Sequence, residues 1–183
     1  MRVLPIALLL VSAATSGSAQ LKFGASEDLA PYIPTPEILV QKMLEAGHVK
    51  AGDVVYDLGS GDGRIVIMAA QRFNARSVGI EIRADLCRKA EERIKALGLE
   101  DRVRIVQDSA LRVDLSPATV VTMYLLTNSN ERMRPSLEKY LKPGARVVSN
   151  DYPIRGWKPA EMLVVRTGTA EHRIFVYEIG RTR

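Results

Sequence analysis

The sequence predicts an α/β fold, a Rossmann-like, doubly wound sheet of seven strands. Short apolar runs rich in β-branched residues alternate with helical segments, which is typical of a mostly parallel sheet. A glycine-rich loop follows the first of these runs, at the point where a strand turns into a helix. Two alternating runs near the C-terminus, joined by a short turn, indicate an antiparallel hairpin at the edge of the sheet.

The composition is that of one ordinary globular domain. The chain has 183 residues, of which 46% are hydrophobic and 26% charged, and this excludes a disordered tail protein and a collagen. Its one cysteine excludes a disulfide scaffold, and with only two histidines we expect no metal site. The net charge of +5 is mild, so it permits an acidic partner without requiring one.

The N-terminus reads as an export signal. Arg2 precedes the apolar stretch Leu4–Ala14, and small residues ending at Ala19 supply a cleavage site. This stretch of about 11 residues is too short for the ~20 that a membrane-spanning helix needs. A buried helix or an uncleaved anchor are the alternatives. The predicted organisation is a signal peptide at 1–19, a linker at 20–30 and one domain at 31–183.

The domain opens with an extended segment and a helix. Residues 31–34 begin and end with proline, which disfavours helical backbone in the residue before it. A helix then starts with Thr35 as N-cap, Pro36 at the first position and Glu37 in the first turn. Gly47 ends it.

Strands and helices alternate through the rest of the chain, so a ligand is expected at the carboxyl ends of the strands, beside the first strand. The predicted strands are Asp53–Leu58, Ser77–Ile82, Arg102–Gln107, Thr119–Leu126, Ala145–Ser149, Met162–Thr167 and Arg173–Ile179. The predicted helices between them are Arg64–Phe73, Ala84–Leu97 and Asn128–Leu141, the last interrupted at Pro135. A turn at Gly168–Glu171 joins the last two strands.

The loop after the first strand, Asp57–Arg64, reads D-L-G-S-G-D-G-R. Its glycines allow positive φ and let the backbone approach a ligand closely. A P-loop would need Gly-Lys-Ser/Thr, and a dinucleotide site uses G-x-G-x-x-G, whereas this loop reads G-x-G-x-G. Asp57 and Asp62 would repel a pyrophosphate and suit a cationic ligand.

S-adenosylmethionine fits this charge pattern, because it carries a sulfonium, an ammonium and one carboxylate but no phosphate. Glu81 ends the second strand, where an acid can accept hydrogen bonds from both ribose hydroxyls. Asp108 follows the third strand, within reach of the adenine amino group. The alternative is that these acids are simply solvated residues at strand ends. The expected cofactor-binding residues are Asp57, Gly59, Ser60, Gly61, Asp62, Gly63, Glu81 and Asp108.

D-x-G-x-G-x-G at the first turn, G-I-E at residues 79–81 and an acid after the third strand resemble class I S-adenosylmethionine-dependent methyltransferases. The similarity covers roughly residues 31–180 and implies the strand order 3-2-1-4-5-7-6, which matches the predicted hairpin. Met123-Tyr124-Leu125-Leu126 stands where DNA amino-base methyltransferases have Asn/Asp-Pro-Pro-Tyr, which argues against adenine or cytosine amino groups as the acceptor.

Several shorter motifs resemble one narrower family, the protein-lysine N-methyltransferases whose mitochondrial members act on the ATP synthase c subunit and the adenine nucleotide translocase. They are Pro31-Tyr32-Ile33-Pro34, Asp57–Arg64, Tyr124-Leu125-Leu126, Ser149-Asn150-Asp151-Tyr152 and Trp157-Lys158-Pro159. Thr127 is a departure, since members often have proline there. The export signal is another, because a periplasm is not known to supply the cofactor; a cytoplasmic or membrane-associated location is the alternative.

The resemblance implies a protein substrate that presents a lysine, with a small membrane protein among the candidates. Desolvation would help the lysine lose its proton, so no dedicated base is required. Tyr124 is expected to line the lysine channel and Asp151 to orient the ammonium. Tyr32 and Trp157 are expected to wall the channel, with plain packing as the alternative.

Other functions remain open at this stage. One is an RNA or small-molecule methyltransferase of the same fold, and another is a non-catalytic module that binds the cofactor. A nucleic-acid partner is disfavoured, because Lys and Arg are spread along the helices and aromatic residues make up only 5% of the chain. Cys87 is expected to be a buried small hydrophobe away from the site, and no function is assigned to His48 or His172.

Overall fold

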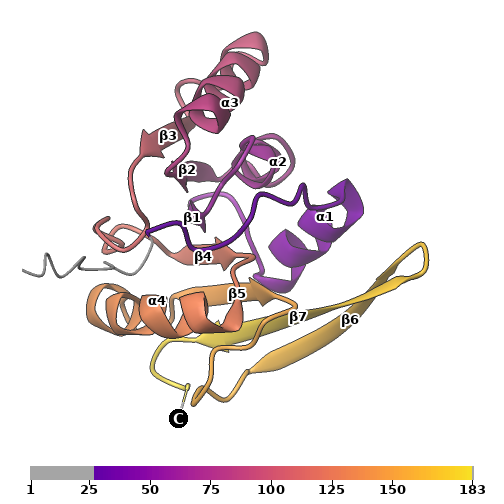
Figure 1. Cartoon of the computed structure of the whole chain (residues 1–183), viewed down its shortest axis with the longest axis vertical. Helices are drawn as coiled ribbons and strands as arrows, with labels where there is room; N and C mark the ends of the chain where they lie inside the picture. The colour runs from indigo at the N-terminus through magenta and orange to yellow at the C-terminus, as the bar shows by residue number, and fades with distance from the viewer. Residues whose placement is uncertain (1–26, 183) are drawn as a thin grey trace, which may run out of the picture.

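A computed structural model describes residues 27–182 of the chain, and its centre is a sheet of seven strands. The strand order is β3-β2-β1-β4-β5-β7-β6, the order that the resemblance to class I methyltransferases implies (Figure 1). The strands are β1 (Val54–Leu58), β2 (Arg76–Glu81), β3 (Val103–Gln107), β4 (Val120–Met123), β5 (Arg146–Asn150), β6 (Glu161–Thr167) and β7 (Ala170–Glu178). The helices are α1 (Glu37–Ala46), α2 (Arg64–Phe73), α3 (Ala84–Ala96) and α4 (Thr127–Tyr140).

The sheet separates two layers of helices because alternate strand residues face opposite sides. In β1, Val55 joins the core formed with α1 and α2, whereas Tyr56 and Leu58 join the core that contains Met133 and Leu137 of α4. Both faces of the central strands are therefore apolar and buried, as expected for a doubly wound sheet.

Strands β1 to β5 run parallel, and β7 pairs antiparallel with both β5 and β6. Leu58 at the end of β1 pairs with Ile80 of β2 and with Met123 of β4. Residues that follow these three strands therefore meet at one edge of the sheet. The edge lies at the point where the chain order reverses beside β1, the usual ligand-binding position of such sheets.

Two sequence predictions about local structure are wrong. The fourth strand ends at Met123 rather than Leu126, because the chain turns there toward α4. Helix α4 continues through Pro135 instead of breaking. Pro135 is exposed, so water can satisfy the carbonyl that loses its partner, while Met133 and Leu137 anchor the opposite face.

The ends of α1 and β7 also differ slightly from the prediction. Thr35 makes no side-chain cap, because α1 begins at Glu37 after Pro36 and no cap hydrogen bond forms. Instead, the carbonyl of Thr35 accepts a hydrogen bond from Arg64 at 2.7 Å. Strand β7 begins at Ala170, so its turn is shorter than the predicted Gly168–Glu171.

The segment just before the predicted domain packs on it rather than acting as a free linker. Leu29 is buried in the same core as α4, and its carbonyl accepts a hydrogen bond from the Ser129 hydroxyl. The export signal predicted at 1–19 and the first part of the linker lie outside the described residues, so they stay predictions. Within residues 27–182, none of the helices has the length and apolar character needed to cross a membrane.

Candidate functional site

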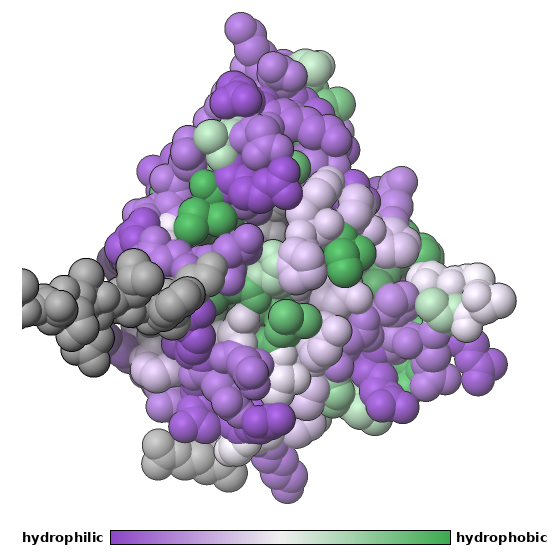
Figure 2. Space-filling model, in the orientation of Figure 1, coloured by the Kyte–Doolittle hydropathy of each residue, from purple (hydrophilic) through white to green (hydrophobic). Residues whose placement is uncertain are grey.

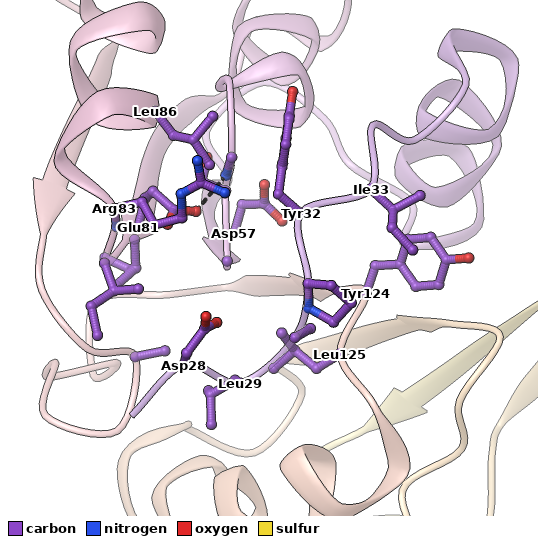
Figure 3. A pocket seen from close by; sticks show the side chains of 18 of the residues that line it. Asp28, Leu29, Tyr32, Ile33, Asp57, Glu81, Arg83, Leu86, Tyr124 and Leu125 are labelled. Carbon is purple, nitrogen blue, oxygen red and sulfur yellow. Dashed lines mark hydrogen bonds between the residues drawn. The ribbon is translucent and has the colours of Figure 1, made fainter. Parts of the chain in front are cut away.

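A pocket opens to solvent at the carboxyl ends of β1, β2 and β4. Its walls come from the extended segment before α1, the glycine loop after β1, the end of β2 with the start of α3, the loop after β3 and the turn after β4. Figure 3 shows Asp57, Glu81 and Tyr32 toward one side of this space and Tyr124 beside Ile33 on another. The face of the molecule in Figure 2 is largely hydrophilic, with apolar side chains gathered near its centre.

The pocket lining is acidic. Six acidic side chains line it, namely Glu27, Asp28, Asp57, Asp62, Glu81 and Asp108. Within residues 27–182 only two basic side chains do so, and both face carboxylates: Arg64 binds Asp62, and Arg83 binds Asp85. The lining therefore favours a ligand that carries positive charge.

The glycine loop brings bare backbone to the pocket. Gly59, Gly61 and Gly63 have φ of 78°, 56° and 77°, values that side chains other than glycine rarely adopt. A Cβ on Gly61 would lie 2.6 Å from the Tyr32 ring, so the loop and the segment before α1 are in close contact here. Gly63 directly precedes α2, where unpaired amides favour the approach of polar or anionic ligand groups.

Glu81 is fixed by the backbone around it. One carboxylate oxygen accepts a hydrogen bond from the Gly61 amide and the other from the Arg83 amide, each at 2.8 Å. The residue is only 6% exposed. Each oxygen keeps a further lone pair, so a pair of ligand hydroxyls can still be bound.

Asp57 is the most perturbed acid in the pocket. It is 2% exposed, and the Thr122 hydroxyl donates a hydrogen bond to it at 2.7 Å. Burial, together with repulsion from Glu81 and Asp62, raises the pKa of Asp57 to about 7, against the opposing hydrogen bond from Thr122. A cation bound nearby would restore the ionised form, which is a property expected of a binding site.

Two other predicted acids already bind arginines. Asp62 accepts two hydrogen bonds from Arg64 at 2.8 Å each, and Arg93 lies 2.9 Å from it. Asp108, at the mouth of the pocket, binds Arg112 at 2.6 Å. Asp62 therefore clamps the loop to α2 and α3, whereas the carboxyl groups of Asp57 and Glu81 are directed at the pocket.

The turn after β4 supplies Tyr124, which lines the pocket. Its ring centroid lies 6.2 Å from that of Tyr152, a further lining residue that the sequence reasoning did not single out. Asp151 does not line the pocket, but its negative charge adds to burial in raising the pKa of the Tyr124 phenol to about 12. It also binds His172 at 2.8 Å.

The two aromatic residues expected to wall the channel, Tyr32 and Trp157, lie in different places. Tyr32 lines the pocket over the glycine loop. Trp157 does not: it is buried against Tyr177, with ring centroids 5.5 Å apart, and its indole nitrogen donates to Glu138 at 3.0 Å. Trp157 therefore has a packing role, which was the alternative to its lining the channel.

Cys87 lies closer to this region than the sequence indicates. It is buried as expected, but its thiol contacts the Glu81 carbonyl at 3.5 Å. Burial raises the pKa of the Cys87 thiol to about 11, so the sulfur stays protonated and unreactive at neutral pH.

These residues fit the cofactor expected from the sequence. Buried carboxylates with spare lone pairs suit ribose hydroxyls and an ammonium, bare glycine backbone permits close approach, and apolar side chains such as Leu86 and Ala110 line the rest of the pocket. A phosphate-bearing nucleotide fits poorly, because the acids would repel it.

Comparison with known proteins agrees with this chemistry. Residues 57–161 match a family described as the ANTKMT methyltransferase domain. A protein-lysine N-methyltransferase of Saccharolobus islandicus (strain REY15A) is 51% identical over 151 residues, which cover 82% of this chain and 94% of that protein. The adenine nucleotide translocase lysine N-methyltransferase of Mus musculus is 30% identical, over 81% of this chain and 63% of that protein.

A solved structure is also similar. It is described as an RNA methyltransferase from Salinibacter ruber in complex with S-adenosyl-L-homocysteine, and it aligns with a TM-score of 0.75 and 44% identity over 80% of this chain and 94% of that one. The fold, the acidic pocket and these relatives lead to one conclusion: the chain belongs to the ANTKMT methyltransferase domain family and is an S-adenosylmethionine-dependent methyltransferase.

Proposed function

We propose that this methyltransferase acts on the side-chain amine of a lysine in a protein. The observation that carries the proposal is the acidic pocket, in which the buried carboxyl groups of Asp57 and Glu81 form no salt bridge within the described residues, whereas both lining arginines are paired with acids. Such a lining attracts a cationic cofactor and a cationic acceptor, and it repels a phosphate backbone. The 51% identity with a protein-lysine N-methyltransferase supports the same acceptor.

Each acid near the glycine loop has a distinct role in this proposal. Glu81 binds the two ribose hydroxyls of the cofactor, since both its oxygens are held in place by backbone amides. Asp57 attracts the cofactor's ammonium. Asp108 reaches the adenine amino group, and Asp62 acts through the loop that it clamps to Arg64 and Arg93. Gly59, Ser60, Gly61 and Gly63 provide the backbone surface of this half of the pocket.

The bound cofactor supplies an electrophilic methyl group on a sulfonium. The protein then has to bind a lysine beside it and remove water, because desolvation lowers the pKa of an ammonium and exposes the nitrogen lone pair. Tyr124, Tyr152 and Tyr32 line the pocket and give apolar ring surface for the lysine chain with hydroxyl groups at the edge. Asp151 lies behind Tyr124 and adds negative charge on this side.

RNA is the second candidate acceptor, because the similar structure from Salinibacter ruber is described as an RNA methyltransferase. The charge of the pocket argues against it. A protein that binds RNA tightly needs cations facing the phosphates, and the two arginines of the lining are held by Asp62 and Asp85. We therefore rank protein lysine above RNA.

The two acceptors are separated by labelling. Purified protein is incubated with cell lysate and S-adenosylmethionine carrying a tritiated methyl group, and the labelled material is divided between ribonuclease and protease. We expect protease alone to release the label from the precipitate. Label released by ribonuclease would overturn the proposal in favour of RNA.

The matched controls for this assay are Glu81→Gln and Asp101→Asn. Glu81→Gln removes a charge that lines the pocket, and labelling should fall by at least tenfold. Asp101→Asn makes the same kind of change at an exposed acid outside the pocket, and it should leave labelling within twofold of the wild type.

A further inference from the structure

One wall of the pocket is built from two tyrosines that belong to different loops. Tyr124 lies in the turn after β4, and Tyr152 lies in the loop after β5. Their ring centroids are 6.2 Å apart and the ring planes are tilted by 32°, so the two rings form one aromatic wall. The wall keeps its shape only if the loop that carries Tyr152 has a fixed position relative to the turn that carries Tyr124.

The backbone of Tyr152 is held by three hydrogen bonds. Its amide donates to the Asn150 carbonyl at 2.7 Å. Its carbonyl accepts one hydrogen bond from the Asn130 side-chain amide at 2.8 Å and another from the Ser149 hydroxyl at 2.6 Å. Asn130 also donates to the Ser149 oxygen at 3.2 Å, so the three groups are linked to one another. The Tyr152 carbonyl therefore uses both of its lone pairs inside the protein.

Asn130 and Ser149 are fully buried, and neither lines the pocket. Asn130 lies at the start of α4, where its backbone amide donates to the Leu126 carbonyl at 2.9 Å, at the end of the turn that carries Tyr124. The Asn130 side chain thus joins this turn to the loop of Tyr152.

The orientation of the Asn130 amide group follows from these contacts. A carbonyl can only accept, so the nitrogen of Asn130 must face Tyr152 and the oxygen must face away. That oxygen is buried and has no hydrogen-bond partner within residues 27–182, which costs folding free energy. A buried polar side chain that is kept at such a cost calls for an explanation, and the fixed position of Tyr152 provides one.

We propose that Tyr152 is a specificity-determining contact for the acceptor lysine, and that Asn130 and Ser149 are positioning residues that act through it. The inference rests on the proposed lysine acceptor and names the residues that shape its channel. Contact with the ring removes water from the lysine chain and its ammonium, which favours loss of the proton. Without the Asn130 donor the loop can move, and the ring no longer closes the channel. Figure 3 shows Tyr124 on a different side of the pocket from Glu81, so cofactor affinity should not depend on this wall.

The test is a double-mutant cycle, with the full-length protein and a synthetic peptide containing a lysine that the labelling experiment identifies. Tyr152→Ala should lower kcat/KM about 10- to 100-fold, whereas Tyr152→Phe keeps the ring and should stay within about threefold of the wild type. Asn130→Ala should lower kcat/KM about tenfold, the usual effect of losing a buried hydrogen bond. In the Tyr152→Ala background the same change should have less than a twofold effect, because the ring that Asn130 positions is already absent. The dissociation constant of S-adenosylmethionine should stay within twofold throughout.

Ser149→Ala and Ser77→Ala form a matched pair that separates positioning from stability. Both serines are buried in strands, and each hydroxyl donates to a backbone carbonyl: Ser149 to Tyr152 at 2.6 Å and Ser77 to Val66 at 2.8 Å. Ser77 does not line the pocket. Both variants should be destabilised to a similar extent in urea unfolding, but only Ser149→Ala should lower kcat/KM, by about three- to tenfold. If Asn130→Ala does not fold, Ser149→Ala takes its place in the cycle.

The positioning role is overturned if Asn130→Ala lowers kcat/KM as much in the Tyr152→Ala background as in the wild type, or if Ser149→Ala is as active as Ser77→Ala. A Tyr152→Ala variant within twofold of the wild type would overturn the contact itself. By contrast, a wild-type protein that binds the cofactor but methylates no lysine peptide would overturn the proposed function.

Discussion

Asp57→Asn should strengthen the folded protein while weakening its hold on the cofactor. The folded-state pKa of Asp57 is about 7, against an ordinary value of 3.8. At a pH between these two pKa values the folded chain binds more protons than the unfolded chain. The free energy of unfolding therefore falls as the pH rises from about 4 to about 7. Above pH 7 the loss amounts to about 4 kcal/mol. Asparagine removes the ionisation, so the variant should gain about 2–4 kcal/mol at pH 8.

Cofactor binding should show the opposite dependence on pH. If S-adenosylmethionine binds only the ionised form of Asp57, its dissociation constant rises as the pH falls below 7, about tenfold at pH 6 and about thirtyfold at pH 5.5. Titration calorimetry between pH 5.5 and 7 measures this range while the ligand's own amino group, whose pKa is about 8, stays largely protonated.

Two variants distinguish the titration of Asp57 from a general effect of acid on cofactor binding. Asp57→Asn should bind the cofactor more weakly than the wild type at pH 7 and with little dependence on pH. Asp101→Asn, an exposed acid outside the pocket, should follow the wild-type curve. A dissociation constant that does not change with pH in the wild type would refute the reasoning, as would a variant that is less stable than the wild type at pH 8.

Three further predictions concern two residues of the site and the processing of the N-terminus. Gly61→Ala places a Cβ 2.6 Å from the Tyr32 ring, at a residue whose φ is 56°. We expect the free energy of unfolding in urea to fall by about 1–2 kcal/mol and the cofactor to bind at least tenfold more weakly. An unchanged affinity would contradict the close contact. Asp62→Asn breaks a buried pair with two partly hydrated arginines and should cost about 2–3 kcal/mol of stability, and a cost below about 0.5 kcal/mol would show that the clamp is unimportant. If the predicted export signal is cleaved after Ala19, N-terminal sequencing of protein from the native host should begin at Gln20, whereas an N-terminus at Met1 would argue against cleavage.

The fold was largely predictable because it depends on patterns local to the sequence. Alternating strands and helices, the glycine loop and the C-terminal hairpin were sufficient to predict the sheet and its edge. Local boundaries were harder. Strand β4 ends at Met123, but the next three residues, Tyr124, Leu125 and Leu126, are equally compatible with a strand. The strand ends there only because the chain turns toward α4. Pro135 suggests a break, but tertiary packing of the opposite helix face outweighs the missing hydrogen bond.

The candidate site was predictable where chain position determines it. Asp57, Glu81 and Asp108 each end or follow a strand, and parallel pairing brings all three to one pocket. His172 gave no such signal, because it meets Asp151 only through the antiparallel pairing of β5 with β7. The ion pair of Asp62 could have been predicted from the sequence, because Arg64 follows it two residues later.

Transfer of a methyl group to a lysine nitrogen is measured most directly on the labelled acceptor itself. After reaction with tritiated S-adenosylmethionine, the acceptor protein is hydrolysed in acid and its amino acids are separated by chromatography. We expect the label to co-elute with N-methylated lysine and to be absent when Glu81→Gln replaces the wild type. Label in any other amino acid, or in nucleosides after nuclease digestion, would contradict a protein-lysine methyltransferase.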